Sequence, residues 1–556
     1  MKLINSRILF GLVTMGLLYT LSGSGLEAYP PQGRQEALDT FEKVFNEVLN
    51  RYVTEVDAGK LVEAGIEGML SELDPYTQFI VESNSHRIDA LTNGEYGGVG
   101  IRLGQLGDTL VVVSPMEGTP AQRFGILAGD HILKIDSIRT RNLSLDDAAK
   151  LVRGEAGTDV QITVRREGLD APLVFNLTRE LIRVPDVSYS GLIESGIGYI
   201  KLTNFSRFTA ENLEQAIRKL QQTPLDGLIL DLRGNPGGLL SAALQSSDLF
   251  IPEDELLLET KGRVSRSNRR FYARRPAVLY PDVQLMVLID QGSASASEIL
   301  AGVIQDYDRG VILGRTSFGK GLVQTVYNLA EETRLKVTTA KYYLPSGRLI
   351  QRKSFGDELR LDDLLESDTL MFNSEAHREM KGGGGITPDV PVERYVADAL
   401  ESELWRRGSF FKFSVQYAGE HPELGLPVSV DSSALEEFRQ WLTQPEYRPS
   451  TAFSEWLQHV PLDSTDIWLG SQDSILDLIS SIRAFEDVVW QAKFDEQSDR
   501  IQRGLEMEIS NVLGGLSARV SASLKGDPAI ATAMSLIRAP GAAEALLKPN
   551  YLTTPE

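Results

Sequence analysis

Two apolar runs in the middle of the chain constrain its fold more than any other feature. Residues 227–232 and 285–290 are short and mostly aliphatic, and a glycine-containing turn follows each of them. Strands with continuous apolar runs are buried on both faces, as in a parallel sheet covered by helices. Helical patterns alternate with these runs, so residues 183–392 are predicted to form one α/β domain.

Length and charge narrow the classes of function. The 556 residues contain 77 Asp and Glu against 56 Lys and Arg, a formal charge of −21. That excess repels phosphate backbones and anionic lipid headgroups, so nucleic-acid binding is disfavoured. At about 150 residues per domain, the length predicts three or four folded units. The chain has no cysteine, which excludes disulfides, thiolate nucleophiles and Cys-ligated zinc.

The amino terminus has the layout of a secretory signal. Lys2 and Arg7 precede a largely apolar run over residues 8–21, and small residues follow it. As a helix this run would rise about 21 Å, which is short of a hydrocarbon core of about 30 Å. Residues 1–25 are therefore predicted to be a signal peptide, with an uncleaved inner-membrane anchor as the alternative. Both predict an extracytoplasmic protein, periplasmic or secreted.

Residues 30–83 are predicted to form a small helical region. Apolar side chains from Leu38 to Tyr52 recur at spacings of three and four, which is the stripe of an amphipathic helix. A second helix is predicted from about 58 to 73. It ends at Asp74-Pro75, because proline disfavours helix in the residue before it.

Residues 84–180 change to short strands and turns. Val160, Ile162 and Val164 alternate with polar residues, as in a half-buried strand, and a short helix is predicted over 144–152. The order of these elements, the segment G-D-H-I-L-K-I-D and the loop G-G-V-G-I resemble a PDZ domain in its bacterial permuted form.

The PDZ resemblance implies a binding loop for a peptide's terminal carboxylate. The loop consists of Gly98, Val99, Gly100 and Ile101, and the peptide would add as a strand beside the helix. Glycines allow positive φ and a close approach of the backbone to an anion. Taken alone, the same glycines are also compatible with an ordinary hairpin turn.

Residues 393–556 are predicted to form a mainly helical carboxyl-terminal domain. Helical spacing continues from Leu505 to Leu524, and a further helix is predicted around 530–537. The four glycines at 382–385 are predicted to be a flexible bridge that leads into the segment I-T-P-D at 386–389. All the tryptophans of the chain lie in it and are interpreted as core: Trp405, Trp441, Trp456, Trp468 and Trp490.

A serine cluster follows the second apolar run. The motif S-A-S-A-S begins at Ser293 and leads into a helical stretch over 299–307. A serine at such a strand-to-helix turn exposes its hydroxyl near the positive end of a helix dipole, which suits a nucleophile. Serine is also a preferred helix cap, and Ser295 or Ser297 could serve only as one. The motif alone does not decide between these interpretations.

A serine nucleophile needs a base, and Lys320 is the better candidate. Histidines are few and none lies near the serine cluster in sequence: His86, His131, His377, His421 and His459. Lys320 is flanked by glycines, and Gln324 shares its face if the segment is extended. Lysine is a base only when neutral, which burial in an apolar pocket favours. Alone, a glycine-flanked lysine is more often a solvated loop residue or a phosphate clamp, but the chain has no Walker-type loop.

A glycine-rich turn after the first apolar run is the third candidate element. It runs over residues 231–239 with the sequence D-L-R-G-N-P-G-G-L. Backbone N–H groups in such a turn can point at a developing oxyanion. A dinucleotide loop is the alternative, but the spacing is not G-x-G-x-x-G and a proline interrupts it.

Together these motifs resemble the carboxyl-terminal processing peptidases, also called tail-specific proteases. The resemblance covers about residues 35–392, in the order PDZ-like region, glycine-rich turn, serine cluster and lysine. The motifs are D-L-R-G-N-P-G-G from Asp231, S-A-S-A-S-E-I from Ser293, F-G-K-G from Phe318 and Y-Y-L-P-S-G-R from Tyr342.

The resemblance implies a fold and a function. The fold is a crotonase-like (ClpP/crotonase-type) α/β core with an inserted PDZ domain that gates substrate entry. The function is serine endoproteolysis near a free carboxyl terminus, with residues 183–392 as the catalytic domain and no metal or other cofactor. Protein or peptide tails are the implied partners, while an adaptor, an activator and a homo-oligomer stay open.

The resemblance also implies the site residues. Ser295 is the nucleophile, Lys320 the general base, and Gln324 the residue that positions the lysine. The backbone N–H groups of Gly237 and Ala296 are the implied oxyanion donors.

Two other functions compete with proteolysis. One is a non-catalytic PDZ scaffold on a crotonase-like core, and the joint presence of Ser295, Lys320 and Gln324 argues against it. The other is acyl-CoA chemistry on the related fold. The signal segment argues against that, because acyl-CoA is a cytoplasmic substrate.

Overall fold

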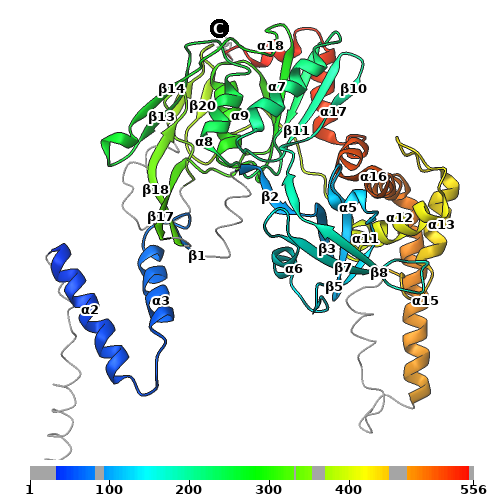
Figure 1. Cartoon of the computed structure of the whole chain (residues 1–556). Coiled ribbons are helices and arrows are strands. Elements are labelled where there is room, and N and C mark those ends of the chain that lie inside the picture. Colours follow the sequence, from blue (N-terminus) through cyan, green and yellow to red (C-terminus); the bar gives the residue numbers. More distant parts are fainter. Residues whose placement is uncertain (1–32, 82–92, 331–332, 353–369, 450–471, 550–556) are drawn as a thin grey trace, which may run out of the picture. The chain divides into compact units, whose positions relative to one another are not determined.

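The computed structural model describes residues 33–81, 93–330, 333–352, 370–449 and 472–549. The chain divides into two compact units, Met1–Leu73 and Asp74–Glu556. The first contains the helices α2 (Arg34–Arg51) and α3 (Ala58–Ser71), as the periodicity predicts (Figure 1). The predicted signal segment lies outside the described residues. Among the helices that are described, none combines the length and the apolar character needed to cross a membrane.

A six-stranded sheet lies at the centre of the second unit, and the two apolar runs are its middle strands. Its order is β10-β11-β12-β15-β16-β21, and all neighbours are parallel except β10 and β11. The strands are β10 (Val187–Glu194), β11 (Ile197–Leu202), β12 (Gly227–Asp231), β15 (Gln284–Ile289), β16 (Val311–Gly314) and β21 (Val390–Pro391). The prediction of buried parallel strands in this region is confirmed.

Helices cover both faces of this sheet, because alternate residues of each strand point to opposite sides. Leu228 and Leu230 pack in one cluster with residues of α7, α8 and α9. Ile229 packs in another with residues of α17 and α18. The helices are α7 (Thr209–Leu220), α8 (Leu240–Ser247), α9 (Ala296–Asp306), α17 (Pro528–Arg538) and α18 (Ala542–Leu546). The last two helices in the described part of the chain therefore pack on the central sheet.

A second, antiparallel sheet carries the segments around the lysine. Its order is β1-β18-β13-β14, with β17 also paired to β18. The strands are β1 (Gln78–Val81), β13 (Leu256–Lys261), β14 (Arg269–Tyr272), β17 (Leu322–Ala330) and β18 (Thr333–Tyr343). Two short strands, β19 (Met371–Asn373) and β20 (Glu379–Lys381), pair with each other.

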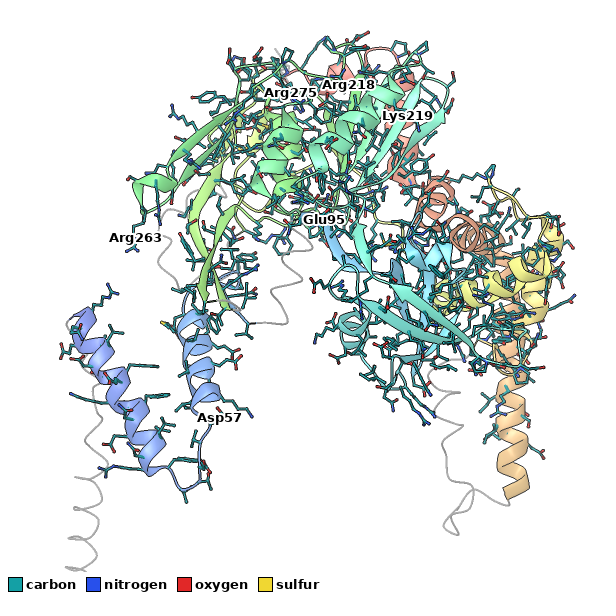
Figure 2. The ribbon with its side chains drawn as sticks, viewed as in Figure 1. Asp57, Glu95, Arg218, Lys219, Arg263 and Arg275 are labelled. Carbon is teal, nitrogen blue, oxygen red and sulfur yellow. The ribbon has the colours of Figure 1, made fainter. Side chains whose placement is uncertain are left out.

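The PDZ-like region is an insertion whose two ends are adjacent strands. The strand β2 (Glu95–Gly98) pairs with β9 (Glu180–Arg183) where the chain enters and leaves. Glu95 lies at this connection (Figure 2) and forms ion pairs with Arg183 and Arg207. The inserted elements are β3 (Ile101–Leu106), β4 (Thr109–Pro115), α5 (Pro120–Arg123), β5 (His131–Ile135), β6 (Ile138–Arg139), α6 (Leu145–Val152), β7 (Asp159–Arg165) and β8 (Leu173–Thr178).

The carboxyl-terminal part is helical, as the sequence predicts. Trp441 and Trp490 are buried in its core, and Trp405 packs against that core. Trp456 and Trp468 lie outside the described residues. The remaining helices are α11 (Ala399–Arg406), α12 (Ser409–Glu420), α13 (Ser432–Leu442), α15 (Gln472–Glu496) and α16 (Ser498–Ser523).

The glycine run at 382–385 is not a flexible bridge, and that prediction was wrong. The Gly383 amide donates to the Leu349 carbonyl at 2.7 Å, and the Gly385 amide donates to the Ile350 carbonyl at 2.9 Å. Gly385 has a φ of 101°, and a Cβ atom there would lie 2.7 Å from the Ser317 carbonyl oxygen. These glycines therefore serve a close approach between backbones rather than mobility.

Candidate active site

The strand-to-helix turn after β15 distinguishes the three serines. The hydroxyl of Ser293 donates to the Leu232 carbonyl at 2.8 Å, and that of Ser297 donates to the Asn235 carbonyl at 2.9 Å. Both serines are completely buried, whereas Ser295 is partly exposed. Ser293 and Ser297 therefore hold the turn against the glycine-rich loop, and Ser295 is the hydroxyl that a substrate can reach.

Ser295 has an unusual backbone conformation. It is the N-cap residue of α9, with φ 55° and ψ −110°. Positive φ is uncommon for a residue with a side chain and occurs where the surrounding structure enforces it, often at functional sites. The capping and nucleophile interpretations are compatible, because the N-cap position also places the hydroxyl at the positive end of the helix.

A buried carboxylate joins the serine turn to the lysine loop. One oxygen of Glu298, Oε2, accepts from the amides of Ser295 at 2.8 Å and Lys320 at 2.9 Å. The other, Oε1, accepts from the Gly319 amide at 2.7 Å and the Ser317 hydroxyl at 2.5 Å. Two amides that donate to one oxygen atom must be near neighbours, so the fold brings Ser295 and Lys320 together.

Tyr342 makes a second link between the two segments. Its hydroxyl donates to the Lys320 carbonyl at 2.6 Å and lies 3.4 Å from the Ser295 carbonyl oxygen. The sequence patterns indicate no role for Tyr342 or Glu298. For Glu298 a signal existed, because serine followed three residues later by glutamate is a capping-box pattern.

Replacing Glu298 with glutamine is expected to lower kcat about tenfold or more and to destabilise the fold by about 1–3 kcal/mol. The amide NH2 group would face amide donors that need an acceptor, so one of the two loops would lose its anchor. Steady-state kinetics and thermal unfolding measure the two effects.

A matched control is Glu508→Gln, which alters a buried carboxylate in the helical region that accepts from Arg519. It should cost stability without lowering kcat. Equal kcat for Glu298→Gln and the unmodified protein would contradict the anchoring role.

The lysine is held in surroundings that favour its neutral form. Burial, helped by the neighbouring charge of Lys336, lowers the pKa of Lys320 to about 8, although Glu298 and Asp74 oppose the shift. Its Nζ atom lies 4.5 Å from the centroid of the Tyr76 ring. An appreciable fraction of Lys320 is therefore neutral at mildly alkaline pH, as a general base requires.

Gln324 contacts a different partner from the one its spacing suggests. Its amide nitrogen donates to the Thr338 hydroxyl at 3.3 Å, and that hydroxyl donates to Asp74 at 3.1 Å. The register between β17 and β18 is irregular between Val323 and Gln324, so simple alternation does not apply there. The role of Gln324 in positioning Lys320 stays a prediction.

The two implied oxyanion donors lie beside Ser295. A Cβ atom at Gly237 would lie 2.6 Å from the Ala294 carbonyl oxygen and 2.9 Å from the Ala296 nitrogen, and φ there is 95°. The Ala296 amide donates no hydrogen bond within the described residues. The Gly237 amide donates to Asn235 Oδ1 at 2.9 Å, a bond that an oxyanion would replace.

Two backbone amides of the glycine loop in the PDZ-like region are available to a ligand as far as the described residues show. Val99 and Gly100 are buried, and within the part of the chain that is described neither amide donates a hydrogen bond. Gly98 ends β2 and Ile101 begins β3, which pairs with β4 alone among the described strands. The other edge of β3 faces α6 and pairs with no strand in the described part of the chain, so a peptide strand can add there.

Comparison with known proteins gives four matches along the chain. Residues 196–358 match the model of peptidase family S41, and residues 111–166 match the PDZ domain. Residues 400–537 match the C-terminal helical domain of a probable PDZ-protease. Residues 24–83 match the N-terminal domain of the activating protease CtpB.

Curated relatives are similar over most of their length. A carboxy-terminal-processing protease of Bartonella bacilliformis is 39% identical over 375 residues, which is 65% of this chain and 86% of the relative. The carboxy-terminal processing protease CtpB of Bacillus subtilis is 33% identical over 416 residues, or 73% and 85%. Among solved structures, the photosystem II D1 C-terminal processing protease is 26% identical over 64% of this chain and 92% of its own, with a TM-score of 0.34.

Proposed function

The chain belongs to peptidase family S41, and we propose that Ser295 and Lys320 are its nucleophile and general base. It is a serine endopeptidase with a PDZ domain and a helical carboxyl-terminal domain, like the carboxy-terminal processing proteases that it resembles. The observation that carries the assignment is the Glu298 carboxylate, which binds the amides of both residues through one oxygen.

The proposed mechanism is acyl transfer. Neutral Lys320 takes the proton of the Ser295 hydroxyl while the Ser295 oxygen attacks the carbonyl carbon of the scissile peptide. The amides of Ala296 and Gly237 donate to the oxyanion that forms. Protonated Lys320 returns its proton to the departing amine, and water then hydrolyses the acyl-enzyme with the lysine again as the base.

Substrate recognition is assigned to the PDZ loop. The buried amides of Val99 and Gly100 would bind the terminal carboxylate of a protein tail, and the tail would add as a strand to the open edge of β3. Unpaired buried amides are rare in folded proteins, which supports a ligand for these two.

The architecture that we propose is crotonase-like, with residues 84–180 as the PDZ domain, 183–392 as the catalytic domain and 393–556 as the helical domain. A parallel sheet covered by helices on both faces supports it. We place the mature protein outside the cytoplasm, released by cleavage within residues 1–25 or anchored by them. The basic and apolar character of that segment supports this location.

Tail recognition predicts that a free carboxylate accelerates cleavage. An unfolded protein with an apolar tail should be cleaved at least about tenfold faster with a free carboxyl terminus than with an amidated one, because an amide loses the charge-assisted bonds. Fragments quantified by mass spectrometry measure this ratio. Equal rates on both tails would exclude recognition of the terminus.

Two glycine variants test whether the PDZ loop causes the preference for a free carboxyl terminus. Gly100→Ala should remove the preference, because φ there is 76° and a Cβ atom would lie 2.3 Å from Thr119. Gly107→Ala is the matched control, with a φ of 62° but open space around the added atom. It should keep the preference. If both variants keep the preference of the unmodified protein for a free carboxyl terminus, another part of the chain recognises the carboxylate.

A further inference from the structure

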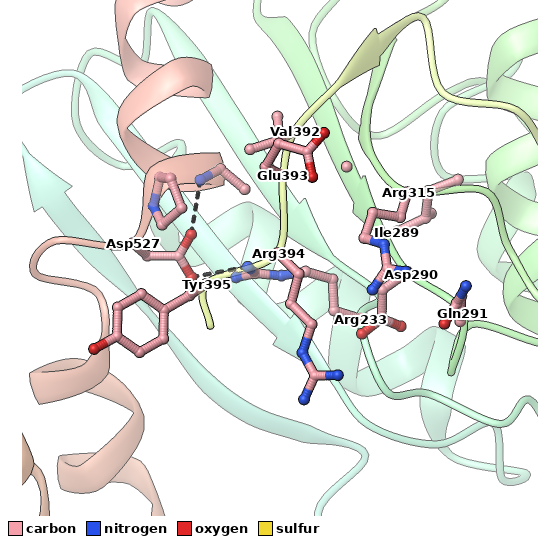
Figure 3. Close-up of a pocket in the computed structure, with 13 residues that line it drawn as sticks. Arg233, Ile289, Asp290, Gln291, Arg315, Val392, Glu393, Arg394, Tyr395 and Asp527 are labelled. Carbon is pink, nitrogen blue, oxygen red and sulfur yellow. Dashed lines mark hydrogen bonds and ion pairs between the residues drawn. The ribbon is translucent and has the colours of Figure 1, made fainter. Parts of the chain in front are cut away.

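One carboxylate of the carboxyl-terminal region reaches the glycine-rich loop beside the active site. Asp527 is the N-cap residue of α17, and its Oδ1 accepts from the amides of Ala529 at 2.8 Å and Ile530 at 3.2 Å. Its other oxygen, Oδ2, accepts from the Arg233 guanidinium at 2.8 Å (Figure 3). Asp527 therefore binds its own helix and the loop with separate oxygens.

Arg233 is clamped between two carboxylates at the start of that loop. Its Nε and Nη2 atoms donate to Asp231, which ends β12 and is 1% exposed. Burial alone would raise the pKa of Asp231, but Lys201 and Arg233 hold it well below its usual range. The planar guanidinium makes fixed, forked bonds, so a carboxylate on each side defines its position.

The loop that begins at Arg233 ends at the oxyanion side of the site. Four residues later, Gly237 lies against the backbone of Ala294 and Ala296 and the Cβ atom of Ser295. Three residues separate Arg233 from Gly237, and one of them, Asn235, accepts from the Gly237 amide through Oδ1 at 2.9 Å. What holds Arg233 therefore bears on the position of Gly237, together with the bonds of the Gly234 amide to Asp290 and of the Asn235 side chain to the Leu202 carbonyl.

The start of the loop borders a pocket on its outer side. The pocket has a volume of about 390 Å³, and its lining includes Arg233, Asp290, Arg315, Tyr395 and Asp527 together with the apolar Ile289, Val392 and Pro528 (Figure 3). Within it the Arg233 guanidinium is bound by Asp527. The opposite anchor is rigid, because Ile530, Ala533 and Ile537 of α17 are buried against the central sheet.

We propose that Asp527 is a positioning residue for proteolysis. Through Arg233 it holds the glycine-rich loop so that the Gly237 amide can meet the oxyanion together with Ala296. The inference rests on the proposed function, since it assigns Gly237 to the oxyanion. It gives the carboxyl-terminal helical region a part in the chemistry of the site.

Asp527→Asn tests the proposal without removing the helix cap. Asparagine is as good an N-cap as aspartate, so α17 should stay intact while the charged bond to Arg233 is lost. We expect kcat to fall about tenfold with KM unchanged, as for an interaction made only in the transition state. Thermal unfolding should shift only by what the loss of one partly buried charged hydrogen bond causes.

A transition-state analogue separates positioning from a merely structural role. A tripeptide aldehyde forms a tetrahedral adduct with the serine, and its affinity for Asp527→Asn should fall by the same factor as kcat/KM. The affinity of the corresponding tripeptide carboxamide, which carries no oxyanion, should not change. Unchanged aldehyde affinity, or a KM effect without a kcat effect, would overturn the proposal.

A second ion pair on the same helix provides the matched control. Glu194 pairs with Arg538 at the other end of α17, away from the loop. Glu194→Gln should therefore leave kcat and aldehyde affinity as in the unmodified protein. An equal loss in both variants would mean that the effect comes from the seating of α17 and would also overturn the proposal.

The behaviour of the unmodified protein distinguishes a failure of the positioning role from a failure of the proposed function. If it cleaves and binds the aldehyde while Asp527→Asn behaves identically, only the positioning role is wrong. If the unmodified protein neither cleaves peptides nor binds the aldehyde, the proposed function fails and this inference fails with it.

Discussion

Ser295→Ala is expected to abolish proteolysis, with kcat reduced by about 10⁴- to 10⁶-fold. The hydroxyl is the only group that the proposed mechanism joins to the substrate, and its removal stops acylation. The side chain is partly exposed at the first position before α9, so its loss should hardly affect packing. Mass spectrometry of fragments from an unfolded protein with an apolar tail measures the effect, and thermal unfolding checks the fold.

Covalent labelling makes the serine experiment decisive. A serine-reactive phosphonate should modify the unmodified protein at Ser295 and leave Ser295→Ala unlabelled. Ser293 and Ser297 should stay unmodified in both, because they are completely buried. Retained cleavage by Ser295→Ala would show that another group is the nucleophile.

Lys320→Arg is the second substitution with a large expected effect, a loss of about 10²- to 10⁴-fold in kcat. Guanidinium stays protonated at every accessible pH, so it cannot accept the serine proton. Lys341→Arg, on the neighbouring strand β18, is the matched control and should keep full activity. Activity of Lys320→Arg close to that of the unmodified protein, with the same pH profile, would end the dyad hypothesis.

The pH profile of the unmodified protein follows from the lysine pKa. Because burial lowers that pKa from 10.5 to about 8, the base is mostly protonated at pH 7 and mostly neutral at pH 9. The logarithm of kcat/KM should therefore rise with pH and level off above about 8. A profile that keeps rising toward 10.5 would mean that Lys320 is solvated in the working enzyme.

Most of the fold could be predicted because its signals are local. The runs at 227–232 and 285–290 are continuous apolar sequences, and they are β12 and β15. The helices α3 and α17 begin after the capping residues Asp57 and Asp527, and α16 ends shortly before the Gly526 turn. Spacing and capping residues act within a few positions, so sequence alone reveals them.

The parts of the site that could not be predicted arise from contacts between distant segments. Asp74 and Tyr76 reach the lysine because β1 pairs with β18, and nothing near them in sequence indicates that pairing. The irregular register before Gln324 changes which face its side chain occupies, and alternation cannot foresee such a bulge. The glycines at 382–385 were mistaken for a linker, because composition does not distinguish flexibility from close backbone packing.

The half-buried Lys320 side chain serves catalysis but lowers the stability of the fold. A base whose pKa is lower in the folded than in the unfolded chain costs about 1.4 kcal/mol per pH unit, so Lys320 weakens the fold by about 3 kcal/mol at neutral pH. The cost is complete below pH 8 and disappears toward 10.5, because only the unfolded chain keeps the proton between those values. Directed evolution screened only for heat resistance would therefore favour an uncharged residue at position 320. Such a screen would raise the stability of the fold and abolish the catalytic activity.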